Sequence, residues 1–178
     1  MRVSRAVVAW LLSPFMALSA CDSAAPAKRT GPSVAYERLL GTLYRNTVPT
    51  VSAAALAKEL AQPAAPLLLD VRTPAEYKVS HIEGARLVPD EAQAAKLLAG
   101  IDRSRPVVVY CTVGYRSERL GERLKDLGFG QVRNLYGGLF EWVNAGHPVH
   151  DARGVTQNIH PYSALWSPWL ERGRKVYD

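Results

Sequence analysis

Four short apolar runs, separated by stretches with helical spacing, constrain the fold of this chain most strongly. They cover residues 67–69, 85–88, 107–110 and 132–135, and none of them alternates between apolar and polar residues. Such runs are typical of strands buried on both faces, and strands that alternate with helices need crossover connections. The pattern therefore predicts an α/β domain of three layers, with a mostly parallel central sheet and helices on both faces.

The stretches around these runs carry helix start and stop signals. Ser52 can cap a helix through residue 60, and Asp90 can cap one through residue 99. Gly128 can end a helix over residues 116–127, and a last short helix is expected over residues 140–145. Each predicted helix lies between or after predicted strands, as the three-layer architecture requires.

Cys111 directly follows the run 107–110 and begins the segment Cys-Thr-Val-Gly-Tyr-Arg. Ligands of parallel sheets bind outside the carboxyl ends of the strands, where this cysteine is expected. Gly114 permits a tight turn, while loop N–H groups, the following helix N-terminus and the Arg116 cation can surround the sulfur. These effects favour the thiolate, so we expect Cys111 to be nucleophilic. The alternative is a buried, inert cysteine at a strand end.

Two further segments flank this loop. Upstream, residues 67–77 read LLLDVRTPAEY and residues 81–85 read HIEGA; downstream, residues 132–142 read VRNLYGGLFEW and residues 146–148 read GHP. Together with Cys-x-x-Gly-x-Arg, they resemble the single-domain rhodanese family of sulfurtransferases over about residues 51–149. The resemblance implies a rhodanese-like fold with the reactive cysteine at the end of a strand. Ser80 stands where the family usually has glycine, and we expect a local turn difference there.

The resemblance also implies a two-step reaction. Cys111 would take a sulfane sulfur from thiosulfate or a persulfide, carry it as a persulfide, and pass it to cyanide or a thiol. Phosphatases of the same fold have five residues between cysteine and arginine, whereas this chain has four, which favours sulfur transfer. No metal or cofactor is expected. The alternative function is a non-catalytic binding or redox-sensing module in which Cys111 is modified.

The expected site is the loop with two supporting residues. Asp70 and Arg72 are expected to pair and to hold the loops around the site, because buried charges need partners. His81 is expected to support the fold and not to act as a base, and Glu76 is expected to be a loop support. The residues expected to bind substrate are Thr112, Val113, Gly114, Tyr115, Arg116 and Ser117.

The N-terminus predicts export and lipidation. Residues 1–20 carry two arginines, an apolar stretch and small residues before Cys21, which is the layout of a secretory signal. Residues 18–21, Leu-Ser-Ala-Cys, resemble the bacterial lipobox, so we expect Cys21 to be lipidated and residues 21–33 to form a flexible tether. The expected location is the bacterial cell envelope, at the inner membrane facing the periplasm. An ordinary secreted protein is the alternative.

The cysteine count and the charge narrow the chemistry further. Cys21 and Cys111 are the only cysteines, so a lipidated Cys21 leaves one thiol, no internal disulfide and no resolving cysteine. Without the signal segment, 20 basic and 16 acidic residues give a net charge of +4. The sequence has no basic stripe with interleaved aromatic residues, so no nucleic-acid partner is expected.

Two segments lie outside the family pattern. Residues 34–50 begin with an amphipathic stripe that predicts an added helix packed on the domain. Residues 150–178 are rich in aromatic and basic residues, among them Trp166, Trp169 and Arg172. The favoured interpretation is that these aromatic residues cover the domain's own core, because Pro168 interrupts any amphipathic helix. A membrane-interface segment and a docking surface for a membrane protein are the alternatives.

Overall fold

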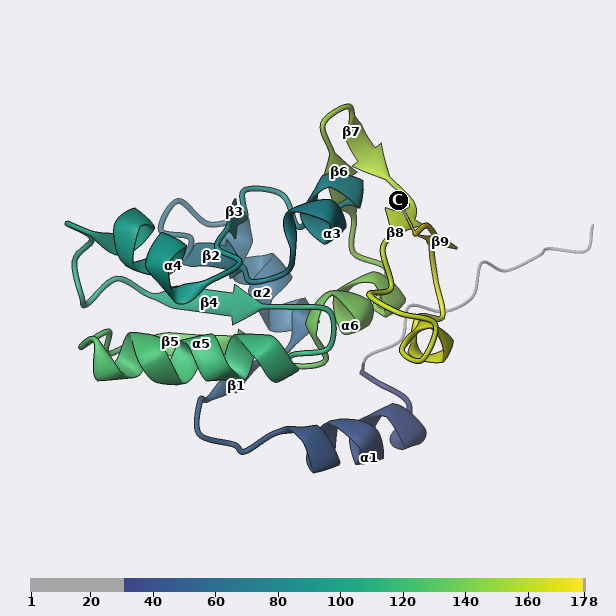
Figure 1. The fold of residues 1–178 in the computed structure, drawn as a ribbon, viewed down its shortest axis with the longest axis horizontal. Coiled ribbons are helices and arrows are strands. Elements are labelled where there is room, and N and C mark those ends of the chain that lie inside the picture. Colours follow the sequence, from purple (N-terminus) through teal and green to yellow (C-terminus); the bar gives the residue numbers. More distant parts are fainter. Residues whose placement is uncertain (1–30, 178) are drawn as a thin grey trace, which may run out of the picture.

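The computed structural model describes residues 31–177 and contains a five-stranded parallel sheet (Figure 1). Its strand order is β1-β5-β4-β2-β3, and every pair in it runs parallel. The strands are β1 (Thr50–Val51), β2 (Leu67–Asp70), β3 (Arg86–Leu87), β4 (Val107–Tyr110) and β5 (Val132–Leu135). The four strands expected from the apolar runs are confirmed. β1 was not predicted, because Thr50 and Val51 are not part of an apolar run.

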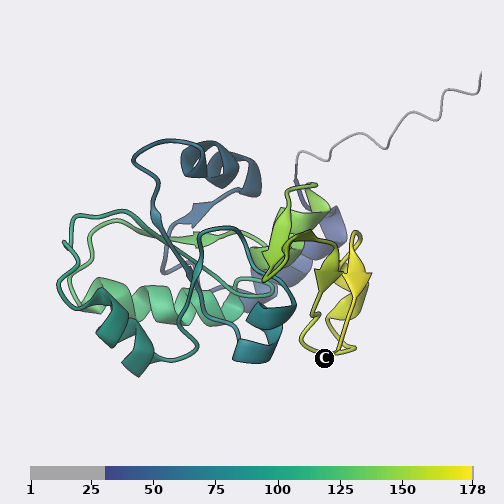
Figure 2. The same cartoon turned by 90° about the horizontal axis from the view of Figure 1, so that it is seen from above.

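Helices cover both faces of this sheet, as predicted. They are α1 (Val34–Leu43), α2 (Ala53–Leu60), α3 (Pro74–Val79), α4 (Glu91–Leu98), α5 (Tyr115–Asp126) and α6 (Gly138–Asn144). Seen along the sheet, α2 lies on one side and α4 with α5 on the other (Figure 2). The buried residues of α1, α2 and α6 share one apolar cluster, and those of α4 and α5 share a second one.

The central strands β2 and β4 explain why the apolar runs do not alternate. Leu68 and Val108 face the cluster beneath α2 and α6, whereas Leu69 and Val109 face the cluster beneath α4 and α5. All residues of both strands are buried. A strand covered on both faces needs apolar side chains at every position.

Most helix boundaries follow the predicted signals. The side chains of Ser52 and Asp90 accept hydrogen bonds from the third amide beyond them, which is N-cap geometry. Gly128, with φ of 91°, follows the end of α5. The six-residue helix α3 was not predicted, although its capping box of Thr73 and Glu76 is a recognisable start signal. Ser80, where we expect a local turn difference from the family, is in extended backbone with φ of −171°, a conformation that any residue can adopt.

The two added segments meet each other on the domain. The C-terminal extension contains the hairpin of β6 (Val149–Asp151) and β7 (Gly154–Thr156), the parallel pair of β8 (Asn158–Ile159) and β9 (Arg174–Lys175), and the 3-10 helix η1 (Ser167–Trp169). Trp169 stacks on Tyr36 of α1 with ring centroids 5.7 Å apart. Trp166 and Trp169 pack against the core, as the core-covering interpretation predicted.

The predictions for the N-terminal signal and Cys21 lie outside the described residues. Within residues 31–177, no helix is both long and apolar enough to cross a bilayer.

Candidate active site

Cys111 lies at the carboxyl end of β4, where the chain turns into α5. Gly114 caps α5 with φ of 92°, a left-handed conformation that favours glycine, and its amide donates a hydrogen bond to Cys111 Sγ at 3.1 Å. The sulfur therefore sits at the positive end of the α5 dipole. Cys111 is only 1% exposed, so access to its sulfur is restricted to the pocket above the loop.

The Gly137-Gly138 turn supports the cysteine loop from the side of α6. The amides of Leu139 and Phe140 donate hydrogen bonds to the carbonyl oxygens of Cys111 and Thr112, at 2.8 and 3.1 Å. A Cβ atom on Gly138 would collide with the Cys111 carbonyl oxygen. The glycine-rich part of the downstream motif thus lets two chain segments approach closely enough to fix the loop.

Tyr44, which follows α1, links the same two segments. Its hydroxyl donates to the Val113 carbonyl at 2.8 Å and accepts from the Gly137 amide at 2.9 Å. Burial raises the pKa of Tyr44 well above its ordinary value, so the hydroxyl remains a donor at any physiological pH. The sequence predicted that Tyr44 belongs to the added amphipathic segment, but it did not predict a contact between Tyr44 and the cysteine loop.

Arg116 forms a double hydrogen bond with Glu76 of α3. Arg116 Nη1 and Nη2 lie 3.0 and 2.8 Å from the two carboxylate oxygens, and Nη2 also donates to Thr112 Oγ1 at 3.0 Å. Burial alone would raise the pKa of Glu76, but hydrogen bonds with Arg116 and its charge outweigh burial and hold that pKa at about 2. Glu76 was expected to support the loop, and Arg116 is the residue through which it does so.

Asp70 and Arg72 form the ion pair that the sequence predicted. Arg72 Nη2 and Asp70 Oδ2 are 2.6 Å apart, and both side chains are fully buried. Arg72 Nη2 also donates to the Ser80 carbonyl at 2.6 Å, which ties the end of β2 to the end of α3. Burial would lower the pKa of Arg72, but the charge of Asp70 and its hydrogen bonds outweigh burial and raise it.

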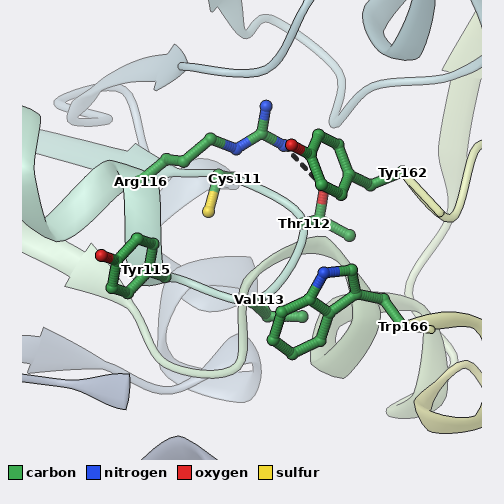
Figure 3. A pocket seen from close by; sticks show the side chains of 7 residues that line it. All are labelled: Cys111, Thr112, Val113, Tyr115, Arg116, Tyr162 and Trp166. Atoms are coloured by element: carbon green, nitrogen blue, oxygen red, sulfur yellow. Dashed lines mark hydrogen bonds between the residues drawn. The ribbon is translucent and has the colours of Figure 1, made fainter.

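A pocket of about 220 Å³ opens above Cys111. Cys111 Sγ points into the space between Tyr115, Val113 and Trp166 (Figure 3). The lining residues are Cys111, Thr112, Val113, Tyr115 and Arg116 from the loop and α5, with Tyr162 and Trp166 from the C-terminal extension. The sequence predicted the first five as site residues, but not the last two, since Tyr162 and Trp166 are more than 45 residues away from the loop along the chain.

Three other predicted residues have supporting positions. Ser117 was expected to bind substrate, but it is fully buried and its hydroxyl donates to Asn134 at 2.7 Å. Gly114 contributes its amide and not a pocket wall. His81 stacks on Tyr77 with ring centroids 3.9 Å apart and does not line the cysteine pocket. In the described part of the chain, no group of three or more His, Cys, Asp or Glu side chains is placed to hold a metal ion.

Comparisons with known proteins agree with this geometry. The family model of the rhodanese-like domain matches residues 52–145. A sulfurtransferase from Allochromatium vinosum is 34% identical over 102 residues, which are 57% of this chain and 94% of that protein. A probable adenylyltransferase/sulfurtransferase MoeZ from Mycobacterium tuberculosis is 35% identical over 82 residues, which are 46% of this chain and only 21% of that protein.

Among solved structures, the Alr3790 protein from Anabaena is 30% identical, with a TM-score of 0.53 over 57% of this chain and 81% of that one. The residues matched by the family model, 52–145, include β2 to β5, α2 to α6 and the cysteine loop. The chain belongs to the rhodanese-like domain family, and its curated relatives include sulfurtransferases.

Proposed function

We propose that this protein transfers a sulfane sulfur through a persulfide on Cys111. In the first step, the Cys111 thiolate attacks the outer sulfur of thiosulfate or of a persulfide. The donor's S–S bond breaks, a new S–S bond forms on Cys111, and the electron pair leaves with sulfite or with the donor's thiolate. In the second step, cyanide or a thiol takes the sulfur and the Cys111 thiolate is regenerated.

The observation that carries this proposal is the position of the Cys111 sulfur. It faces a small pocket, accepts a hydrogen bond from the Gly114 amide and lies at the N-terminal end of α5. Amide donors and a helix N-terminus stabilise negative charge on the thiolate and on the persulfide that replaces it. The pocket of about 220 Å³ above Cys111 gives the outer sulfur of a persulfide a place to lie.

Intact mass measurement on the purified protein tests this function. After incubation with thiosulfate, wild type should gain the mass of one sulfur atom, and Cys111→Ser should gain none. With cyanide added, wild type should release sulfite and thiocyanate over many turnovers. A Cys111 persulfide that forms once and does not turn over with any acceptor would favour the redox-sensing alternative.

We further propose that the protein is tethered to the bacterial cell envelope through a lipid on Cys21, with the domain at the periplasmic face of the inner membrane. The signal layout and lipobox of residues 1–21 support this location. Growth of expressing bacteria with a labelled fatty acid should label wild type but not Cys21→Ser. Fractionation should find wild type with the inner membrane, and an unlabelled, soluble wild-type protein would contradict the tether. A membrane protein that docks on the C-terminal extension is a further partner that this location would allow.

A further inference from the structure

We propose that Tyr162 and Trp166 of the C-terminal extension determine which sulfur donors reach Cys111. They would favour organic persulfides and thiosulfonates with a small apolar substituent over the thiosulfate dianion. The inference rests on the proposed sulfur transfer and names the substrate class of that site.

The pocket wall opposite the cysteine loop is aromatic. Trp166 packs against the domain core, so its indole has a fixed position next to Val113 (Figure 3). Tyr162 of the extension, which is 51% exposed, and Tyr115 at the start of α5, which is 43% exposed, also line the pocket. An apolar substituent on a donor would be buried against these rings, whereas the three oxygens of a sulfonate group would lose water there.

Arg116 has little capacity left to compensate a doubly charged donor. Three of its five N–H donors already point to Glu76 and Thr112. The Glu76 carboxylate balances its charge, and the Tyr162 ring covers its guanidinium face at 4.7 Å. A thiosulfate dianion would therefore meet a largely apolar wall and one cation, Arg116, whose charge Glu76 already balances.

The backbone of Tyr162 provides an independent observation. Its φ of 66° places a non-glycine residue in the left-handed region, which costs about 1 kcal/mol or more. The Tyr162 amide donates to His160 Nδ1 at 3.0 Å, which helps to hold this conformation. Strained backbone of this kind concentrates at functional sites. Here it keeps the Tyr162 ring over Arg116 at the mouth of the pocket.

The size of the pocket limits the substituent. Its volume of about 220 Å³ lies below the roughly 300–1,000 Å³ of sites for drug-sized ligands. A phenyl or short alkyl group is therefore the largest unit we expect. With a thiosulfonate, the Cys111 thiolate would take the terminal sulfur, the donor's S–S bond would break, and the electron pair would leave with the sulfinate anion.

Three donors with cyanide as the common acceptor test the inference. For wild type, kcat/KM of thiocyanate formation should be highest with benzenethiosulfonate, lower with methanethiosulfonate and lowest with thiosulfate. Trp166→Ala should lower kcat/KM for benzenethiosulfonate about tenfold, equivalent to about 1.4 kcal/mol, and change the other two less than about twofold. Tyr162→Ala should lower the ratio of benzenethiosulfonate to thiosulfate by a similar factor, and Trp166→Phe should retain most of the wild-type preference.

Leu165→Ala is the matched control, because Leu165 lies in the same segment, is 77% exposed and does not line the pocket. It should leave all three rates within about twofold. A variant that misfolds loses activity with all three donors. The ratio of kcat/KM between donors therefore reports on the aromatic pocket wall and not on folding. An unchanged ratio in both Trp166→Ala and Tyr162→Ala overturns this inference alone. Absence of any Cys111 persulfide with all three donors overturns the proposed function, and the inference with it.

Discussion

Replacing Glu76 by glutamine should reveal how strongly the Glu76–Arg116 pair stabilises the fold. Glutamine keeps the size of the side chain and an oxygen that can accept from Thr73 or Thr112, but it removes the charge that faces Arg116. The substitution therefore isolates the electrostatic part of an interaction that joins α3 to the first turn of α5.

The expected loss of stability can be estimated from the pKa of Glu76. This pKa is about 2 in the folded protein, compared with an ordinary value of 4.5. That difference corresponds to an upper bound of roughly 3 kcal/mol of stability at neutral pH. Arg116 is 30% exposed, so solvent screening reduces the bound. We expect a loss of about 1.5 to 3 kcal/mol in the free energy of unfolding of Glu76→Gln at pH 7.

The same pKa determines in which direction the stability difference between wild type and Glu76→Gln changes with pH. Because the pKa of Glu76 is depressed in the folded state, its contribution is fully present above pH 4.5 and is lost as the pH falls towards 2. Urea titrations of both proteins should therefore show a stability difference that shrinks to less than about half of its neutral value by pH 3.

A matched control is Glu59→Gln, which breaks a surface pair with Arg133 in which the side chains are 35% and 30% exposed. This variant should cost at most about 1 kcal/mol. A difference for Glu76→Gln that stays constant between pH 7 and pH 3 would refute the electrostatic explanation and leave hydrogen-bond geometry as the cause.

Three further substitutions test the supports of the loop. Asp70→Asn should cost about 3 to 5 kcal/mol in urea unfolding, because it leaves the buried Arg72 charge without its partner; a loss below about 1 kcal/mol would argue against a charged pair. Tyr44→Phe should cost about 1 to 3 kcal/mol and slow Cys111 persulfide formation, since the Val113 carbonyl and Gly137 amide both lose a partner; unchanged stability and rate would remove Tyr44 from the loop support. Gly114→Ala should slow persulfide formation about a hundredfold by displacing the loop, because its Cβ would meet the Tyr44 hydroxyl at a φ of 92°. Gly130→Ala, with open space around it, is the control that should keep the wild-type rate.

Much of the fold could be predicted because its signals are local. The β2 and β4 runs are apolar at every position because both faces of the sheet are covered. Ser52 and Asp90 start helices through hydrogen bonds to amides only three residues away. Signals of this kind lie within a few residues and can be recognised in the sequence alone. The short elements β1 and α3 were nevertheless missed, α3 despite its capping box.

The site could be predicted only in part, for the same reason. Cys111, Gly114 and Arg116 lie within one turn at the end of a strand, so their proximity follows from their spacing. Ser117 occupies the same segment, and its sequence position could not tell that the side chain would turn inwards to Asn134. The direction of a side chain depends on which face of α5 the sheet covers.

The sequence by itself determined a parallel α/β domain, the strand that ends at Cys111 and the helix that begins behind it. The tertiary structure alone decided that Glu76 pairs with Arg116 across 40 residues, that Tyr44 ties the loop to the Gly137 turn, and that Tyr162 and Trp166 close the pocket. The physical reason is that strand and helix formation depends on neighbouring residues, whereas these contacts depend on how distant segments pack around the same core.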